Sequence, residues 1–240
     1  RIFERCDVAV VNADDPRVRA MPRAGQRVIT FSLQDPAADY FLAREPELVL
    51  ACRGEALLPM SALKLQGEHN AANALAALAM CEALDLPRAP VLAALATFGG
   101  LAHRAQWVAD VAGVRYVNDS KGTNVGATIA AISGMAGPLV LIAGGDGKNQ
   151  DFDELRPVCR GKVRHVVLIG RDAPRLAAAF DGVCTSERAT DMRAAVAAAR
   201  AAARPGDTVL LSPACASLDM FRDYAHRGEE FAAAVRSLAG

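Results

Sequence analysis

The second half of the chain alternates between short apolar runs and alanine-rich stretches. The apolar runs lie at residues 114–117, 139–143, 163–170 and 208–212, and helical stretches are expected at 124–135, 173–180 and 190–203. This alternation is typical of β-α-β units, which build a mostly parallel sheet with helices on its faces. The pattern therefore predicts an α/β fold.

The first half is less regular. Short strand-like runs lie at residues 7–12, 27–31 and 47–50. A helix is expected directly after Gly67, because leucines recur among small residues over a long stretch without Gly or Pro. Pro87 and Pro90 are expected to mark the end of that helix. The Gly99-Gly100 pair is the best candidate boundary and predicts two units, 1–99 and 100–240.

Composition narrows the classes of protein. With 240 residues, 52% of them hydrophobic, the chain can bury a sizeable core. The formal net charge is zero, so nothing favours nucleic acid as a partner. Every apolar run is shorter than the roughly 20 residues that cross a bilayer. The six cysteines are scattered without a C-x-x-C pair, which favours reduced cytosolic thiols over a disulfide framework or a zinc site.

Three predicted strands run directly into polar or glycine-rich sequence. The segments are N-D-S-K-G-T-N at 118–124, G-G-D-G-K-N at 144–149 and P-A-C-A-S-L-D at 213–219. Ligands of parallel sheets bind beyond the carboxyl ends of the strands, so these segments are expected to meet at one edge. Glycines in the second segment would let the backbone approach a ligand closely.

The side chains of these segments suit an anionic ligand. Lys121 and Lys148 would supply ammonium groups for phosphate or carboxylate. Asp119 would take a ribose hydroxyl or lie near a bound cation. Thr123 and Ser217 offer hydroxyls at expected helix starts, where free N–H groups also bind anions. Together they predict a multiply charged substrate.

Ordinary structural explanations compete with this interpretation. Asp119 or Thr123 alone would be a helix cap, and Lys121 alone a solvated lysine. The sequence has no complete dinucleotide fingerprint and no G-x-x-x-x-G-K-[ST] motif. It also lacks G-x-S-x-G, which disfavours a hydrolase and leaves Cys215 as a small packed residue.

Two asparagines in the first half form a separate candidate. Asn70 and Asn73 lie three residues apart, so they share one face of the expected helix near its start. Their carboxamides present the donor and acceptor edges that reading an adenine requires. The alternative is that Asn70 caps the helix and Asn73 has no role. Just past the expected boundary, Arg104 would reach a phosphate or form an ion pair.

Taken together, these segments resemble the Mur ligase family. The elements that carry the resemblance are G-E-H-N-A-A-N-A-L-A-A-L-A at 67–79, H-R at 103–104, N-D-S-K-G-T-N at 118–124, G-G-D-G-K-N-Q-D-F at 144–152 and L-S-P-A-C-A-S-L-D-M-F-R-D-Y-A-H-R-G-E-E-F at 211–231. The D-S-K and S-P-A-C-A-S elements are more specific to the members that add D-glutamate. The resemblance implies that 1–99 is the last part of a P-loop-type central ATPase domain and 100–240 a Rossmann-like C-terminal domain.

The resemblance implies an ATP-dependent, Mg²⁺-requiring ligase of peptidoglycan precursor synthesis in the cytoplasm, expected to be a monomer. ATP would convert the carboxylate of UDP-N-acetylmuramoyl-L-alanine into an acyl phosphate, which the amine of D-glutamate would attack. Because the chain begins with Arg1 and not Met, we expect a truncation, and the resemblance implies that the P-loop and the metal-binding residues lie upstream. This chain alone is then expected to be inactive. The alternatives are another amino-acid-adding Mur or folylpolyglutamate-type ligase, and a non-catalytic nucleotide- or amino-acid-binding module.

The resemblance also implies roles for single residues. On the nucleotide side, Asn70 and Asn73 would contact the base, and Arg104 and Asp119 the phosphates and ribose. Lys121 would lie near the reacting phosphate or the incoming amino acid, which makes Lys121 and Asp119 the catalytic candidates. The D-glutamate carboxylates would be held by Thr123, Lys148, Ser217 and the backbone N–H of Leu218.

Three positions depart from the family pattern. Gly122 stands where Ala is usual, which we expect to be a minor change. Gln106 stands where Glu is common, and this replacement would weaken an interface contact. Tyr224, at the edge of the expected glutamate pocket, stands where Phe is frequent, and its hydroxyl is expected to be tolerated.

Overall fold

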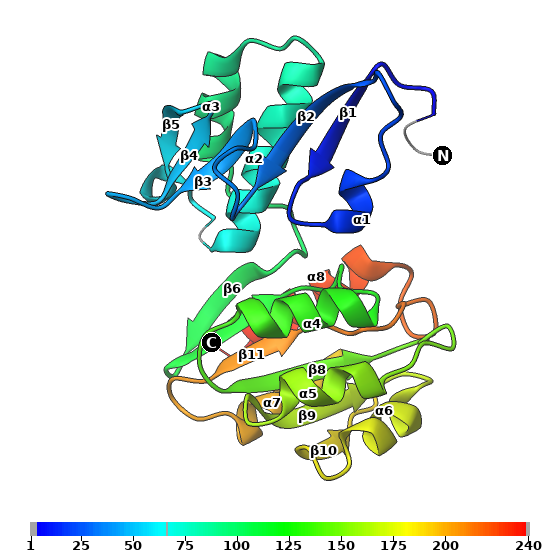
Figure 1. The fold of residues 1–240 in the computed structure, drawn as a ribbon. Helices are drawn as coiled ribbons and strands as arrows, with labels where there is room; N and C mark the ends of the chain where they lie inside the picture. Colours follow the sequence, from blue (N-terminus) through cyan, green and yellow to red (C-terminus); the bar gives the residue numbers. More distant parts are fainter. Residues whose placement is uncertain (1–3, 66, 239–240) are drawn as a thin grey trace. The chain divides into compact units, whose positions relative to one another are not determined.

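The computed structural model describes residues 4–65 and 67–238. The chain divides into two compact units, Arg1–Gly99 and Gly100–Gly240 (Figure 1). Arg1, whose identity predicts a truncated start, lies outside the described residues. Among the helices of the described ranges, none combines the length and the apolar character that crossing a membrane requires.

The second unit is built on a six-stranded sheet with the strand order β10-β9-β8-β11-β7-β6. Its strands are β6 (Gln106–Val111), β7 (Val114–Asn118), β8 (Leu139–Gly144), β9 (Val163–Ile169), β10 (Thr185–Arg188) and β11 (Thr208–Leu211). Neighbouring strands are parallel except for the antiparallel pair β6–β7. The prediction of an α/β fold with a mostly parallel sheet is therefore confirmed.

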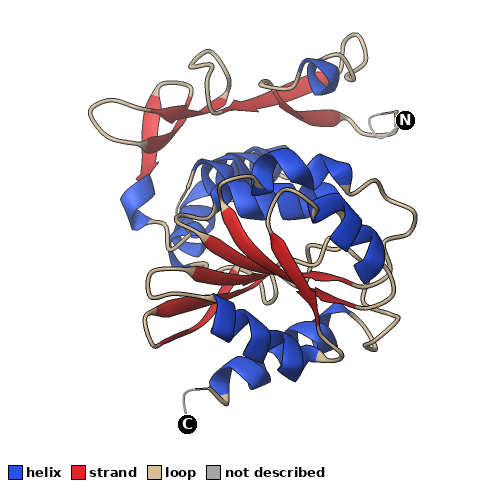
Figure 2. Ribbon diagram, turned by 90° about the horizontal axis from the view of Figure 1, so that it is seen from below, coloured by secondary structure: helices blue, strands red, loops and turns tan. Residues whose placement is uncertain are grey.

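Helices cover both faces of this sheet (Figure 2). They are α4 (Val125–Gly134), α5 (Arg156–Cys159), α6 (Ala173–Phe180), α7 (Met192–Ala202) and α8 (Tyr224–Arg236), with a 3-10 turn η2 at Asp153–Leu155. Because successive strand side chains point to opposite faces, β8 divides its residues between two cores. Leu139 and Leu141 join the cluster that contains α4, α5 and α6. Val140 and Ile142 join the cluster formed with α7 and α8.

The first unit has a five-stranded sheet in sequential order, β1 to β5. Its elements are β1 (Val8–Asn12), α1 (Pro16–Arg19), β2 (Arg27–Ser32), β3 (Tyr40–Ala43), β4 (Val49–Cys52), β5 (Glu55–Pro59), η1 (Met60–Ala62), α2 (Glu68–Ala83) and α3 (Arg88–Thr97). The pairs β1–β2 and β2–β3 are parallel, and the other two are antiparallel. Buried alanines and leucines of α2 pack against the sheet and form the core.

The two prolines after α2 have a different role from the predicted one. Helix α2 already ends at Ala83, with Leu84 as its C-cap. Pro87 is instead the N-cap of α3, and Pro90 lies in its first turn. Proline is tolerated there because the first N–H groups of a helix have no partner inside it. The prolines therefore begin a second helix that the apolar pattern did not reveal.

Candidate active site

Three loops meet at the carboxyl edge of the second unit's sheet. Strand β11 lies between β7 and β8 and is parallel to both. The N–H of Ala214 donates to the carbonyl oxygen of Gly122 over 2.9 Å, which joins the β11 and β7 loops. Asp146 and Ala216 exchange two backbone hydrogen bonds of 2.9 and 3.0 Å, which join the β8 and β11 loops. The predicted meeting of these segments at one edge is confirmed.

The loop after β9 completes this edge. The N–H of Asp172 donates to the carbonyl oxygen of Gly145 over 3.0 Å, and its carboxylate accepts the Gly147 N–H over 2.6 Å. The N–H of Arg171 donates to the carboxylate of Asp219 over 2.7 Å. Four consecutive parallel strands therefore contribute backbone and carboxylate groups to one continuous network.

The glycines after β8 serve this loop packing. A Cβ at Gly144 would collide with the carbonyl oxygen of Ile169, and one at Gly145 with that of Ala216. Both have positive φ, 127° and 129°, which L side chains rarely adopt. A Cβ at Gly147 would meet the ring of Phe152. The space beside these glycines is filled by protein, so the expectation that they open the backbone to a ligand is wrong.

Asp119 is held in a fixed orientation at the end of β7. One carboxylate oxygen accepts the Ser212 hydroxyl over 2.8 Å, and the other accepts the Ala105 N–H over 3.1 Å. Burial raises the pKa of Asp119, against the opposing effects of these two hydrogen bonds and of the exposed Arg104. A carboxylate with a raised pKa and a nearby guanidinium is typical of functional sites.

Lys121 lies against an aromatic ring. Its ammonium nitrogen is 3.8 Å from the centroid of the Tyr224 ring, a cation–π contact. The His103 and Tyr224 rings form a T-shaped pair with their centroids 6.1 Å apart. The backbone N–H of Lys121 donates to the His103 carbonyl oxygen over 3.0 Å. Tyr224 and Lys121 are therefore brought together although 103 positions in the sequence separate them.

Helix capping does not explain the candidate residues. Asn124 is the N-cap of α4, and its side chain accepts the Ala127 N–H over 2.9 Å. Asp119 and Thr123 are not used in this way. Gly67 occupies the N-cap of α2, so Asn70 does not cap that helix either. The capping alternatives for all three residues are wrong.

The D-glutamate candidates on the other loops differ in exposure. Ser217 is buried and Leu218 is 71% exposed. Lys148 is exposed, with φ of 48° and its N–H donating to the carboxylate of Asp146 over 3.0 Å. Ser217 begins only a turn, since α8 starts at Tyr224 and is capped by Asp223. The prediction that the Ser217 hydroxyl lies at a helix start is therefore wrong.

Cys215 is completely buried, as expected for a small packed residue. Burial raises the pKa of its thiol to about 12, so the thiolate is disfavoured at neutral pH. Its carbonyl oxygen accepts a hydrogen bond from the guanidinium of Arg227 over 3.1 Å. The backbone of Cys215, and not its sulfur, takes part in the loop network.

Sequence reasoning missed three residues of this edge: Asn118, Ser212 and Arg227. Asn118 accepts the Ser120 N–H over 3.1 Å and donates to the Gly228 carbonyl oxygen over 3.0 Å. Arg227 is fully buried. A signal for Arg227 was available, because it lies four residues before Phe231, on the same buried face of α8.

The first unit contains a pocket of about 150 Å³ beside α2. Asn70 and Asn73 are the polar residues of its lining, and the apolar ones are Leu63, Leu65, Ala74, Ala77, Leu95 and Phe98. Apolar walls with a few hydrogen-bonding groups suit a planar nucleobase. The two asparagines are therefore brought to a common cavity, as their spacing predicts.

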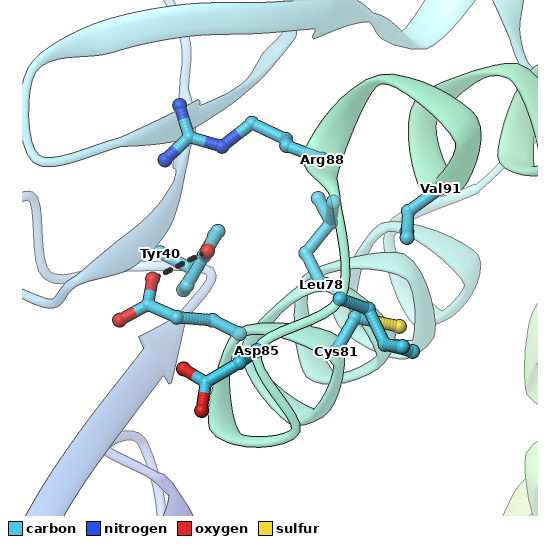
Figure 3. A pocket seen from close by; sticks show the side chains of 8 residues that line it. Tyr40, Leu78, Cys81, Asp85, Arg88 and Val91 are labelled. Atoms are coloured by element: carbon cyan, nitrogen blue, oxygen red, sulfur yellow. Dashed lines mark hydrogen bonds between the residues drawn. The ribbon is translucent and has the colours of Figure 1, made fainter.

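A larger pocket, of about 270 Å³, lies at the other end of α2 (Figure 3). Several of its polar groups bind other side chains: the Tyr40 hydroxyl donates to Glu82 over 2.7 Å, and Arg88 pairs with Glu55 over 2.7 Å. Glu82 also accepts from Arg53 over 2.8 Å. These polar side chains therefore bind one another within the first unit.

Within ranges 4–65 and 67–238, no group of three or more His, Cys, Asp or Glu residues lies close enough together to hold a metal ion. Asp119 uses its carboxylate oxygens for Ser212 and Ala105. These residues do not fit a Mg²⁺ site of their own.

Known proteins resemble both units. The family described as "Mur ligase middle domain" matches residues 1–81, and "Mur ligase, glutamate ligase domain" matches residues 103–215. Proteins named UDP-N-acetylmuramoylalanine--D-glutamate ligase are 52% identical in Methylococcus capsulatus, over 100% of this chain and 52% of theirs, and 54% identical in Aromatoleum aromaticum, over 99% and 52%. The chain thus spans about half the length of the curated relatives it matches.

Solved structures share the fold at low identity. Folylpolyglutamate synthase from Mycobacterium tuberculosis gives a TM-score of 0.68 at 20% identity, over 97% of this chain and 55% of that one. MurF from Acinetobacter baumannii gives 0.66 at 18% identity, over 95% and 51%. With the loops of the second unit assembled at one sheet edge and both units matched by the same family, the chain belongs to the Mur ligases.

Proposed function

We propose that the intact protein carrying this chain joins D-glutamate to UDP-N-acetylmuramoyl-L-alanine at the expense of ATP, in the synthesis of peptidoglycan precursor. Relatives that bear this activity in their names are more than 50% identical over nearly the whole chain. The single structural observation that carries the proposal is the meeting of the Lys121, Lys148 and Ser217 loops at one sheet edge.

The two units have separate tasks in this proposal. Residues 1–99 form the last part of the central ATPase domain, and residues 100–240 form the C-terminal domain. The asparagine pocket supports the first assignment, because Asn70 and Asn73 border an apolar cavity suited to adenine. A fold neighbour of this chain, the folylpolyglutamate synthase, is described in complexes with ADP and AMPPCP.

The second unit supplies the groups that bind the charged parts of the substrates. Arg104 and Asp119 contact the phosphates and the ribose, and Lys121 faces the phosphoryl group or the incoming amino acid. D-glutamate carries two carboxylates, which calls for more than one donor group. Thr123, Lys148, Ser217 and the backbone N–H of Leu218 are assigned to them, with Tyr224 at the edge. Support comes from the loop contacts and from the Lys121–Tyr224 pair.

The chemistry is an acyl transfer through a phosphorylated carboxylate. The terminal phosphoryl group of ATP passes to the carboxylate of UDP-N-acetylmuramoyl-L-alanine. The amine of D-glutamate then attacks the acyl carbon, and inorganic phosphate leaves as the amide forms. Cationic groups of the sheet edge would stabilise the negative charge that builds up on the oxygens. Mg²⁺ would neutralise the phosphates of ATP when bound.

The reaction draws on ATP, and the cysteines of the chain are free thiols. Both features suit an enzyme of the cytoplasm, and we propose that it acts as a monomer. The proposal is tested by supplying the intact protein with ATP, UDP-N-acetylmuramoyl-L-alanine and one of four amino acids: D-glutamate, meso-diaminopimelate, L-lysine or L-alanine. Phosphate release and the mass of the product are measured.

Release of phosphate with D-glutamate, together with a product heavier by one glutamyl residue, is the expected result. Preference for another amino acid would reassign the protein to a different ligase of the family. Binding of nucleotide without any product would support a non-catalytic binding module instead.

A further inference from the structure

Arg227 is a buried cation whose hydrogen bonds go to hydroxyl and carbonyl oxygens, while the charge of Asp219 raises its pKa against the effect of burial. Its side chain is 0% exposed. Among the described residues it forms no salt bridge, and its three hydrogen bonds go to the hydroxyl of Ser120 (3.0 Å), the carbonyl oxygen of Ser120 (2.8 Å) and that of Cys215 (3.1 Å). Burial lowers the pKa of Arg227 to about 10, so it stays charged at neutral pH.

Such a residue is costly to keep, because removing a guanidinium from water is unfavourable unless good hydrogen bonds replace the solvent. Apolar side chains can be buried on a helix face without this desolvation cost, as Phe231 and Val235 are on the same helix. The arginine therefore has to be explained by what its three hydrogen bonds connect.

The guanidinium bridges the two loops that carry the candidate ligand-binding groups. Ser120 stands between Asp119 and Lys121, and Cys215 lies two residues before Ser217. The hydroxyl of Ser120 also donates to the carbonyl oxygen of Tyr224 over 2.7 Å. The ring of Tyr224 in turn makes the cation–π contact with the ammonium group of Lys121. One side chain thus reaches the β7 loop, the β11 loop and the start of α8.

We propose that Arg227 is a positioning residue that sets the spacing between Lys121, which faces the phosphoryl group or the incoming amino acid, and Ser217, which is assigned to a D-glutamate carboxylate. This inference rests on the proposed function for its substrate. The planar fork of arginine points donors in several fixed directions, so that one group can hold Ser120 and Cys215 together. A lysine keeps the charge but has no fork and cannot span both loops in the same geometry.

The kinetic test compares four variants of the intact protein. Arg227→Lys keeps the charge, Arg227→Met removes it, and Ser120→Ala removes one hydrogen-bonding partner. Arg222→Met is the matched control, because Arg222 is an exposed arginine on the segment just before α8. We expect Arg227→Lys to raise the apparent KM for D-glutamate about tenfold, Ser120→Ala to raise it less, and Arg222→Met to leave it within twofold. A normal KM in Arg227→Lys would overturn the proposal.

A spectroscopic test does not depend on activity. The lysines are labelled by reductive methylation with ¹³C-formaldehyde, and the Lys121 signal is assigned by its loss in Lys121→Arg. In the unaltered protein the Tyr224 ring current should shift this signal upfield. In Arg227→Lys, which itself adds one lysine that can be labelled, the shift of the Lys121 signal should shrink while the signals of the other original lysines stay in place. A Lys121 signal that keeps its shift in Arg227→Lys would refute the positioning role.

The two tests separate the two ideas. If the protein shows no ligase activity but Arg227→Lys still moves the Lys121 signal, the positioning role stands and the proposed function fails. If the protein is active and neither KM nor the Lys121 signal responds to Arg227→Lys, the positioning role fails alone. Should Arg227→Met fail to fold, Arg227→Lys and Ser120→Ala still decide the matter.

Discussion

The ammonium nitrogen of Lys121 lies 3.8 Å from the centre of the Tyr224 ring, and the same tyrosine accepts the hydroxyl of Ser120 through its carbonyl oxygen. Ser120 and Lys121, which are neighbours in the sequence, therefore both contact Tyr224 at the start of α8. The ring provides a negative face that favours the charged lysine in a defined place. Tyr224 therefore acts on Lys121 through its π-system, and its hydroxyl is not needed for this contact.

Substitution at Tyr224 separates the ring from the hydroxyl. Tyr224→Phe keeps the aromatic face and should change the apparent KM for D-glutamate less than twofold. Tyr224→Leu removes a contact worth about 1 kcal/mol, which corresponds to a loss of about fivefold in kcat/KM. Steady-state kinetics of the intact protein measure both. Equal losses in the two variants would assign the effect to the hydroxyl and contradict the cation–π role.

Lys148 is exposed on the loop after β8, and its ammonium group is the one proposed to bind a D-glutamate carboxylate. Lys148→Ala should raise the apparent KM for D-glutamate by about tenfold or more, since a charge-assisted hydrogen bond contributes about 1.5–3 kcal/mol. The KM for ATP should remain close to its original value. Lys162→Ala is the control, because Lys162 precedes β9, at the opposite edge of the sheet, and donates to Ser133. An unchanged KM for D-glutamate in Lys148→Ala would count against the assigned role.

Asp119 has a raised pKa because it is buried. A carboxyl group that binds protons more tightly in the folded state lowers the free energy of unfolding as pH rises from its ordinary value of 3.8 through the raised one. Asp119→Asn removes this dependence and should make the protein equally or more stable at pH 7, while activity falls on the order of 100-fold.

Thermal unfolding of both proteins between pH 4 and about pH 8 checks this dependence. Asp110→Asn is the control, because this exposed carboxylate of β6 pairs with the exposed Arg115 over 3.4 Å and should change the pH profile much less, since exposed ion pairs contribute little. If the Asp119→Asn protein were clearly less stable than the original at pH 7, the carboxylate would be stabilising and the stated sign would be wrong.

Gly144 should tolerate no side chain. Gly144→Ala adopts positive φ at a cost of about 1–2 kcal/mol, and its Cβ collides with the carbonyl oxygen of Ile169, which adds about 1–3 kcal/mol. Gly161→Ala is the control, because Gly161 has φ of 74° but nothing within 4 Å of an added Cβ. Urea unfolding should show the larger loss for Gly144→Ala. If both variants lost the same free energy of unfolding, the contact between the added Cβ and the Ile169 carbonyl oxygen would be relieved without an energetic cost, and the prediction would be wrong.

The pattern of apolar residues along the chain was sufficient to predict where the central strands of the second unit begin. Strands β7, β8, β9 and β11 begin where the apolar runs begin, because a strand covered on both faces needs nearly continuous apolar residues. Strands β6 and β10 escaped prediction, since each lies at a sheet edge and β10 is exposed along its whole length. An edge strand has fewer buried neighbours and so leaves a weaker pattern in the sequence.

The meeting of the Lys121, Lys148 and Ser217 loops could also be foreseen, because parallel strands present their carboxyl ends on the same side. Residue types and their order along the chain were enough for that step. The structure adds the order β8-β11-β7, which decides that the Ser217 loop lies between the other two. Strand order depends on how the connecting helices pack and cannot be read from the runs themselves.

Asn118, Ser212 and Arg227 needed the tertiary structure. Each acts through partners that lie far away in the sequence, as Ser212 does with Asp119 and Arg227 with Ser120. Periodicity reports which face of an element is buried, but it does not report what is packed against that face. The sequence by itself determined the type of chemistry at the sheet edge, through its charged and hydroxyl side chains. Only three-dimensional packing decided which of those groups face one another, because hydrogen bonds depend on distances between atoms that the chain order does not contain.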